Sequence, residues 1–146
     1  MDKKISIILS TYNEAHIIKT AIDKIFMTLD NVEIVVVDDN SVDGTLEILK
    51  TVDNNNFKFY SRNTRGLASA FLLGLINTNG DYIGWIDSNM PQLMSHYKEM
   101  ITKLEKYDVV LLSRYVEGGG DQRSKIRILS SKIVNMLCRL ILGLSL

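Results

Sequence analysis

The sequence has little of what marks several common classes of small protein. It is 146 residues long and contains one proline and one cysteine. Cys138 has no second cysteine with which to form an intramolecular disulfide, which fits a reducing compartment. The sequence has no Cys/His pattern with zinc spacing, no Walker loop and no G-x-G-x-x-G fingerprint. It therefore offers no zinc site, P-loop or dinucleotide-binding turn of these known kinds. No charged and apolar leader precedes the first strand-like residues, and we therefore expect a cytoplasmic protein without a signal peptide.

The chain also has no net charge, because it carries 17 Lys/Arg and 17 Asp/Glu. The two signs are nevertheless separated along the sequence. Residues 1–113 carry 11 basic and 15 acidic side chains, whereas residues 114–146 carry 6 and 2. A basic final segment suits an anion or an anionic membrane, although on these counts ordinary solvated charge is an equally good interpretation.

Continuous apolar runs alternate with segments of helical periodicity. Runs without polar alternation are typical of strands buried on both faces, and they predict a mostly parallel sheet flanked by helices in an α/β domain. We expect strands at 5–10, 32–38, 57–60, 82–87 and 109–113. We expect the intervening helices at 17–29, 46–52, 67–76 and 93–104. The length predicts a single domain.

Polar residues gather where these strands end. The four polar stretches are Ser10–Glu14, Asp38–Ser41, Asp87–Asn89 and Ser113–Tyr115. Because ligands of open α/β sheets bind at the carboxyl ends of the strands, we expect one site there. Asp38 and Asp39 either contact that ligand or only satisfy the turn that follows them, and the sequence leaves both interpretations open.

Two further stretches have the chemistry of phosphate binding. Arg62 and Arg65 precede a helix start and suit a diphosphate, although an ordinary surface loop explains this stretch better when it is taken alone. Three consecutive glycines at 118–120 predict a loop that closes over a substrate. Beyond them, Arg127 and Ser131 are four residues apart and share one helix face.

The final segment, 124–146, is predicted to be one helix with a narrow polar stripe. Its apolar arc is too wide for a surface helix of a small domain, and it is too short and interrupted for a membrane span. We expect it to lie in a membrane interface or to pack on something else. Because the chain ends without polar residues, we expect it to be truncated at the C-terminus.

Six stretches, taken together, resemble one family. They are SIILSTYNE, EIVVVDDNSVDGT, RNTRGLASAFLLGL, GDYIGWIDSN, LLSRYVEGGGDQRS and LSSKIVNMLCRLILGL. In this order they are similar to the inverting family 2 glycosyltransferases of the GT-A (Rossmann-like) fold, in the branch similar to dolichol-phosphate mannosyltransferase. The resemblance implies transfer of a sugar from a GDP- or UDP-sugar to a polyprenyl or dolichyl phosphate, at the cytosolic face of a membrane. It divides the single domain 1–146 into a nucleotide-sugar-binding half, about 1–113, and an acceptor loop with an amphipathic helix, 114–146.

The resemblance also implies roles for single residues. The nucleotide-sugar would be bound by Ser10, Tyr12, Glu14, Asp39, Arg65 and Asp87. Mg²⁺ or Mn²⁺ would be held by Asp87, Asn89 and Gln92. Because Asn89 stands where the family has a second acid and an amide brings no charge, we expect the metal to be held weakly. The acceptor phosphate would be held by Arg114, Arg127 and Ser131, and catalysis would depend on Asp87, Arg114 and Arg127.

The implied chemistry fits these residue types. Inversion is a single displacement, in which the leaving diphosphate develops charge that a metal and nearby cations offset. A lipid phosphate is already an anionic nucleophile and therefore needs no strong general base. The alternative is a non-catalytic nucleotide-sugar-binding or membrane-associated module derived from the same fold. A nucleotidyltransferase is disfavoured because its Gly/Lys-rich loop is missing.

Overall fold

The structure of the chain is a computed structural model that describes residues 3–88, 95–113 and 124–143. The chain forms two compact units, Met1–Asp108 and Val109–Leu146, which are considered separately below. Most of the regular structure lies in the first unit.

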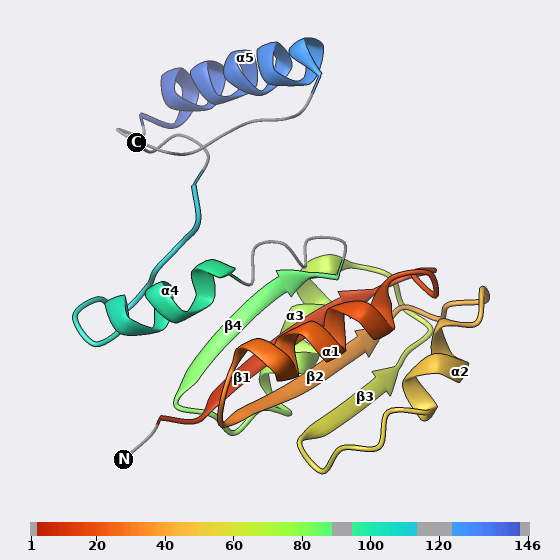
Figure 1. Cartoon of the computed structure of the whole chain (residues 1–146). Coiled ribbons are helices and arrows are strands. Elements are labelled where there is room, and N and C mark those ends of the chain that lie inside the picture. The colour runs from red at the N-terminus through yellow and green to blue at the C-terminus, as the bar shows by residue number, and fades with distance from the viewer. Residues whose placement is uncertain (1–2, 89–94, 114–123, 144–146) are drawn as a thin grey trace. The chain divides into compact units, whose positions relative to one another are not determined.

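The first unit is built on a four-stranded parallel sheet (Figure 1). Its strand order is β3-β2-β1-β4. The strands are β1 (Ile5–Thr11), β2 (Val32–Asp38), β3 (Phe57–Ser61) and β4 (Tyr82–Asp87). After β3 the chain returns past β1, so the strand order reverses between β1 and β4. The mostly parallel α/β class and the first four predicted strands are confirmed.

Helices cover both faces of this sheet (Figure 1). The helices of this unit are α1 (Ile18–Thr28), α2 (Thr45–Lys50), α3 (Leu67–Leu75) and α4 (Tyr97–Lys103). On one face, apolar side chains of β1 and β2 pack with those of α1, α2 and α4, and the largest of them are completely buried. α3 lies on the opposite face against β1 and β2, where Ala70 and Gly74 allow it to approach Ile8. The predicted burial on both faces is confirmed for the central strands β1 and β2, whose faces both lose water on folding. It is not found for the outer strands, because β3 is half-buried and β4 exposes Ile83 and Trp85.

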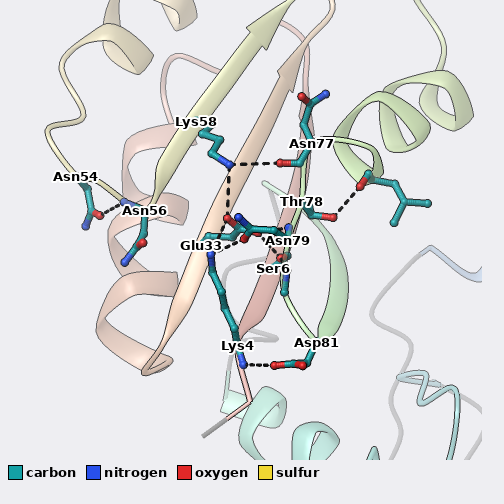
Figure 2. Close-up of polar contacts among 12 residues, drawn as sticks. Lys4, Ser6, Glu33, Asn54, Asn56, Lys58, Asn77, Thr78, Asn79 and Asp81 are labelled. Carbon is teal, nitrogen blue, oxygen red and sulfur yellow. Dashed lines mark hydrogen bonds and ion pairs between the residues drawn. The ribbon is translucent and has the colours of Figure 1, made fainter.

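A cluster of charged and amide side chains lies at the edge of the sheet where β1 and β2 begin (Figure 2). Glu33 is 2% exposed there and accepts a hydrogen bond from Ser6 Oγ at 2.5 Å. Its carboxylate also accepts hydrogen bonds from the backbone N–H of Asn79 at 2.7 Å and from Lys4 Nζ at 3.1 Å. Lys58 Nζ lies 3.7 Å from the same carboxylate. This cluster joins β1, β2 and β3 at the end of the sheet where these strands begin, opposite to their carboxyl ends.

The second unit contains one helix, α5 (Lys125–Leu142), among its described residues. The strand predicted at 109–113 is wrong, because these residues have no regular structure and Leu111 is 80% exposed. A strand needs a neighbour for its backbone hydrogen bonds, and no described strand pairs with this segment. The apolar side chains of α5 are largely exposed, with Ile126 and Leu140 at 81% and 78%. Within the described residues, no helix combines the length and the apolar character that crossing a membrane requires.

Candidate nucleotide-binding site

The candidate site lies at the carboxyl ends of β1, β2 and β4, where the strand order reverses. Open α/β sheets bind ligands at such a switch point, because the loops after neighbouring strands diverge there and leave polar ends accessible. The loops that follow these strands contain most of the side chains that the sequence predicts for the site.

The loops after β1 and β2 are locked together by reciprocal hydrogen bonds. Asn13 adopts a left-handed backbone conformation (φ 55°), its N–H donates to Ser41 Oγ at 2.8 Å, and its Oδ1 accepts from Val42 N–H at 2.9 Å. Hydrogen bonds from the Thr45 hydroxyl and from the backbone N–H of Ala15 lower the pKa of Asp43. The two loops therefore form one rigid rim.

The two adjacent acids at the end of β2 have different partners. Asp38 is completely buried and accepts hydrogen bonds from both the N–H and the hydroxyl of Ser41, so it satisfies the turn. Asp39 forms an ion pair with Arg62 Nε at 2.5 Å and accepts a hydrogen bond from Gly66 N–H at 3.0 Å. Both oxygens of Asp39 are therefore engaged with the loop before α3. Its predicted contact with a nucleobase stays a prediction.

Arg62 is the cation that fixes this loop. Beyond Asp39, it donates to Ser69 Oγ at 2.8 Å and to the carbonyl oxygen of Gly66 at 2.6 Å. The sequence predicts a diphosphate contact or an ordinary surface loop for this stretch. It does not indicate the ion pair of Arg62 with Asp39, because 23 residues separate the partners. Arg65, in the same loop, is exposed instead. Its guanidinium lies over the ring of Tyr12 at 3.8 Å and donates to the Tyr12 hydroxyl.

Ser10 and Asp87 are register partners on β1 and β4 and so share a face of the sheet. Ser10 Oγ is buried and has no hydrogen-bond partner among the described residues. Asp87 is exposed, and its carboxylate makes no hydrogen bond or ion pair with another described residue. A carboxylate and a hydroxyl oxygen are both ligands for a hard cation. The chemistry of these two oxygens therefore fits a divalent metal ion, and a buried hydroxyl without a partner is costly unless a ligand satisfies it.

Glu14 lies where three of these strand ends meet. Its N–H donates to Thr45 Oγ1 at 3.0 Å, at the start of α2. Its Oε2 accepts hydrogen bonds from Thr11 Oγ1 at 3.0 Å and from Ser88 Oγ. Ser88 lies within the polar stretch predicted at the end of this strand, but the sequence assigns it no role because its partner Glu14 is 74 residues away.

Five predicted site residues lie outside the described part of the first unit. Asn89, Gln92 and Arg114 lie outside the described residues, so the structure tests none of their roles. Arg127 and Ser131 lie on α5 in the second unit, where Arg127 is exposed and Ser131 is half-buried. Within the described ranges no group of three His, Cys, Asp or Glu side chains could hold a metal ion.

Most of the chain matches one protein family. The family model described as "Glycosyl transferase family 2" matches residues 6–143. A dolichol-phosphate mannosyltransferase of Pyrococcus furiosus is 34% identical over 129 residues, which are 80% of this chain and 34% of that protein. The chain spans 19% and 36% of the lengths of two other curated relatives, both glycosyltransferases.

Solved structures have the same arrangement of sheet and helices. A mannosyltransferase of Pyrobaculum calidifontis in complex with GDP-Man and Mn²⁺ is 27% identical with a TM-score of 0.53, covering 60% of this chain and 28% of that one. A glucosyl-3-phosphoglycerate synthase of Mycobacterium tuberculosis in complex with Mn²⁺, UDP and glucosyl-3-phosphoglycerate is 26% identical with a TM-score of 0.57. That match covers 71% of this chain and 40% of the other.

Proposed function

The chain belongs to glycosyl transferase family 2, and from this membership we propose that it transfers a sugar from a nucleotide-sugar to a polyprenyl or dolichyl phosphate. The donor is a GDP- or UDP-sugar, bound at the carboxyl ends of β1, β2 and β4. The reaction is a hexosyl transfer with inversion, similar to that of dolichol-phosphate mannosyltransferase. The name of the Pyrococcus furiosus relative supports the lipid acceptor.

One observation carries the donor half of the proposal. The unengaged carboxylate of Asp87 and the unpartnered buried hydroxyl of Ser10 lie side by side at the switch point of the sheet. The acids at the ends of β1 and β2, in contrast, already accept hydrogen bonds within the protein; they are Glu14, Asp38 and Asp39. Asp87 is therefore the acid best placed to meet a ligand.

The donor nucleotide would lie along the rim formed by the loops after β1 and β2. Tyr12 offers an aromatic face, and Arg65 a cation for the diphosphate. Asp39 and Glu14 complete the predicted pocket, Asp39 by holding the loop that presents Arg65.

Asp87, Asn89 and Gln92 would hold Mg²⁺ or Mn²⁺ against this diphosphate. When bound, the metal ion would offset the charge that develops on the leaving diphosphate. Two solved neighbours contain Mn²⁺ together with a nucleotide or nucleotide-sugar, which supports metal use in this chain. One carboxylate and two amides bring a single negative charge, so we expect affinity to be low.

The acceptor phosphate would be held by Arg114, Arg127 and Ser131. An oxygen of this phosphate attacks the anomeric carbon while the bond from that carbon to the donor diphosphate breaks. The electron pair leaves on the diphosphate, and the configuration inverts in this single step. Because the nucleophile is already an anion, the arginines need only position it.

The helix α5 would bring the chain to the cytosolic face of a membrane. It contains four cationic and no acidic residues among its 18, and its described apolar side chains are largely exposed. A helix of this kind lies in the membrane interface, with its cations at anionic head groups.

Calorimetric titration with GDP- and UDP-sugars, with and without Mn²⁺, tests the donor half. Incubation of the bound donor with a polyprenyl phosphate then tests transfer. We expect Mn²⁺-dependent binding of one donor and formation of a polyprenyl phosphate that carries the transferred sugar. Absence of nucleotide binding would contradict the whole proposal.

A non-catalytic nucleotide-sugar-binding module is the second candidate, favoured by Asn89 in place of a second acid. Metal-independent binding without transfer would support it over the enzyme. Asn89→Asp adds the missing charge, and an unchanged metal affinity in that variant would show that Asn89 is not a ligand.

A further inference from the structure

Glu14 connects the three strand ends that form the candidate site. Its backbone is fixed to the loop after β2 through Thr45, and its carboxylate is fixed to the end of β1 through Thr11. The third connection runs to Ser88, which directly follows Asp87 and is 1% exposed. No other described side chain joins the loop after β1 to the residue that follows β4.

This third connection lies just beyond the last register pair of β1 and β4. The backbone pairing of β4 with β1 ends at Ser10 and Asp87. The residues before Asp87 are therefore held by β1, whereas the residue after it is not held by this pairing. The hydrogen bond from Ser88 to Glu14 holds the next residue, and thus limits how far the end of β4 can move away from β1. Asp87 itself has no partner among the described residues that could orient its carboxylate.

We propose that Ser88 and Glu14 are positioning residues that hold the Asp87 carboxylate at the distance from the nucleotide-binding rim that a shared metal ion requires. The inference rests on the proposed function, because it assigns Asp87 to the metal ion. A metal ligand that is displaced by a fraction of an ångström binds the ion more weakly. Mutation of residues that orient a metal ligand therefore typically lowers metal affinity about 10–100-fold.

The same sheet contains a matched control for this pair. At the opposite edge, Ser6 Oγ donates to the buried carboxylate of Glu33 (Figure 2). Ser6 and Ser88 are both buried, and each donates its hydroxyl to a glutamate on another segment. Ser6 lies on the first strand near its beginning and far along that strand from Ser10. Removal of either hydroxyl should lower stability, whereas only Ser88 should affect the metal ion.

The experiment compares Ser88→Ala, Ser88→Thr and Ser6→Ala in the full chain. Mn²⁺ is titrated calorimetrically into protein saturated with GDP or UDP, whichever the unmodified chain binds, and nucleotide binding is also measured without metal. We expect Ser88→Ala to weaken Mn²⁺ binding about tenfold, and to change the metal-free nucleotide affinity by a clearly smaller factor. Ser88→Thr keeps the hydroxyl and should restore Mn²⁺ binding, and Ser6→Ala should leave it unchanged.

Thr11→Val provides a second route if Ser88→Ala does not fold. It preserves the side-chain volume and removes only the other hydrogen bond to Glu14 Oε2. We expect weaker Mn²⁺ binding in this variant as well, by a smaller factor.

Unchanged Mn²⁺ affinity in Ser88→Ala, or an equal loss in Ser6→Ala, would overturn the positioning role while the proposed function stands. If the unmodified chain binds nucleotide and Mn²⁺ but transfers no sugar, the transferase proposal fails and the positioning role is still decided by the variants. If the unmodified chain binds no Mn²⁺, both proposals fall.

Discussion

Glu33 is a carboxylate that folding removes almost completely from water. Burial by itself raises the pKa of Glu33, but the hydrogen bonds from Ser6, from the backbone N–H of Asn79 and from Lys4 outweigh it, so that the pKa lies below its ordinary value. A lowered folded-state pKa means that the ionised form is bound more tightly in the folded state than in the unfolded chain. Glu33 therefore stabilises the fold in its charged state.

Glu33→Gln is expected to lower the free energy of unfolding at pH 7 by about 1.5–3 kcal/mol, the usual worth of hydrogen bonds to a charged group. The contribution of Glu33 is fully present above the unfolded-state pKa of about 4.3 and is lost as the pH falls through the lowered folded-state pKa. The difference between the unmodified chain and the variant should therefore shrink between pH 7 and pH 3. Urea unfolding at several pH values measures it.

The control for this prediction is Glu105→Gln, at an exposed side chain without a hydrogen bond or ion pair to another described residue. It should change stability by less than about 0.5 kcal/mol at either pH. A Glu33→Gln deficit that stays constant down to pH 3 would contradict the role of the charge.

Single residues also show where the sequence was sufficient and where it was not. Both interpretations of the Asp38-Asp39 pair were open from the sequence, because the two acids stand at the end of a buried strand. Asp38 binds Ser41, three residues away, and a local turn of that kind is readable from the sequence. Asp39 binds Arg62, whose approach depends on the position of β3 and on the loop before α3. That contact is tertiary, and local pattern alone does not specify it.

At the scale of elements, apolar runs predicted the strands that pair with a neighbouring strand. The strands β1, β2 and β4 follow from runs that are apolar on both faces, and each observed boundary lies within one residue of its predicted position. Residues 109–113 have the same composition and yet form no strand, because no described strand provides the second set of backbone hydrogen bonds. An apolar run therefore predicts a strand only where a neighbour is available.

The helix α3 depends on a glycine that brings it close to the sheet. A Cβ at Gly74 would lie 2.5 Å from Cγ2 and 3.3 Å from Cγ1 of Ile8, which is completely buried on β1. Gly74→Ala gains about 1 kcal/mol of helix propensity, but overpacking against this stiff side chain costs about 1–3 kcal/mol. We expect a net loss of stability in thermal or urea unfolding.

A double-mutant cycle separates the two contributions. In the background of Ile8→Ala the clash is absent, so Gly74→Ala should become neutral or stabilising. Equal effects of Gly74→Ala in both backgrounds would show that contact with Ile8 is not the reason for the glycine.

At the scale of the whole molecule, charge is distributed unevenly along the chain. The net charge of zero combines an excess of acidic residues in 1–113 with an excess of basic residues in 114–146. Association with an anionic surface would therefore depend on the basic segment and not on net charge. The structure divides into two units at Asp108 and Val109, whereas the division of a single domain into a donor half and an acceptor segment at about residue 113 stays a prediction. Any acceptor site would depend on tertiary contacts, which no local sequence pattern specifies.

The basic segment predicts how the full chain should respond to membranes. Lys125, Lys132 and Arg139 are spaced by seven residues on α5, so they lie along one stripe of the helix. We expect the chain to sediment with vesicles of mixed zwitterionic and anionic lipid and to be released as salt is raised, because each cation near such a surface contributes about 1 kcal/mol.

Lys132→Glu should weaken binding about tenfold or more, since it removes one attraction and adds a repulsion. Lys50→Glu, an equal change of charge at an exposed side chain of α2, should have little effect. Equal losses in the two variants would show that net charge controls the association, and unchanged binding in Lys132→Glu would show that α5 does not face the lipid through this stripe.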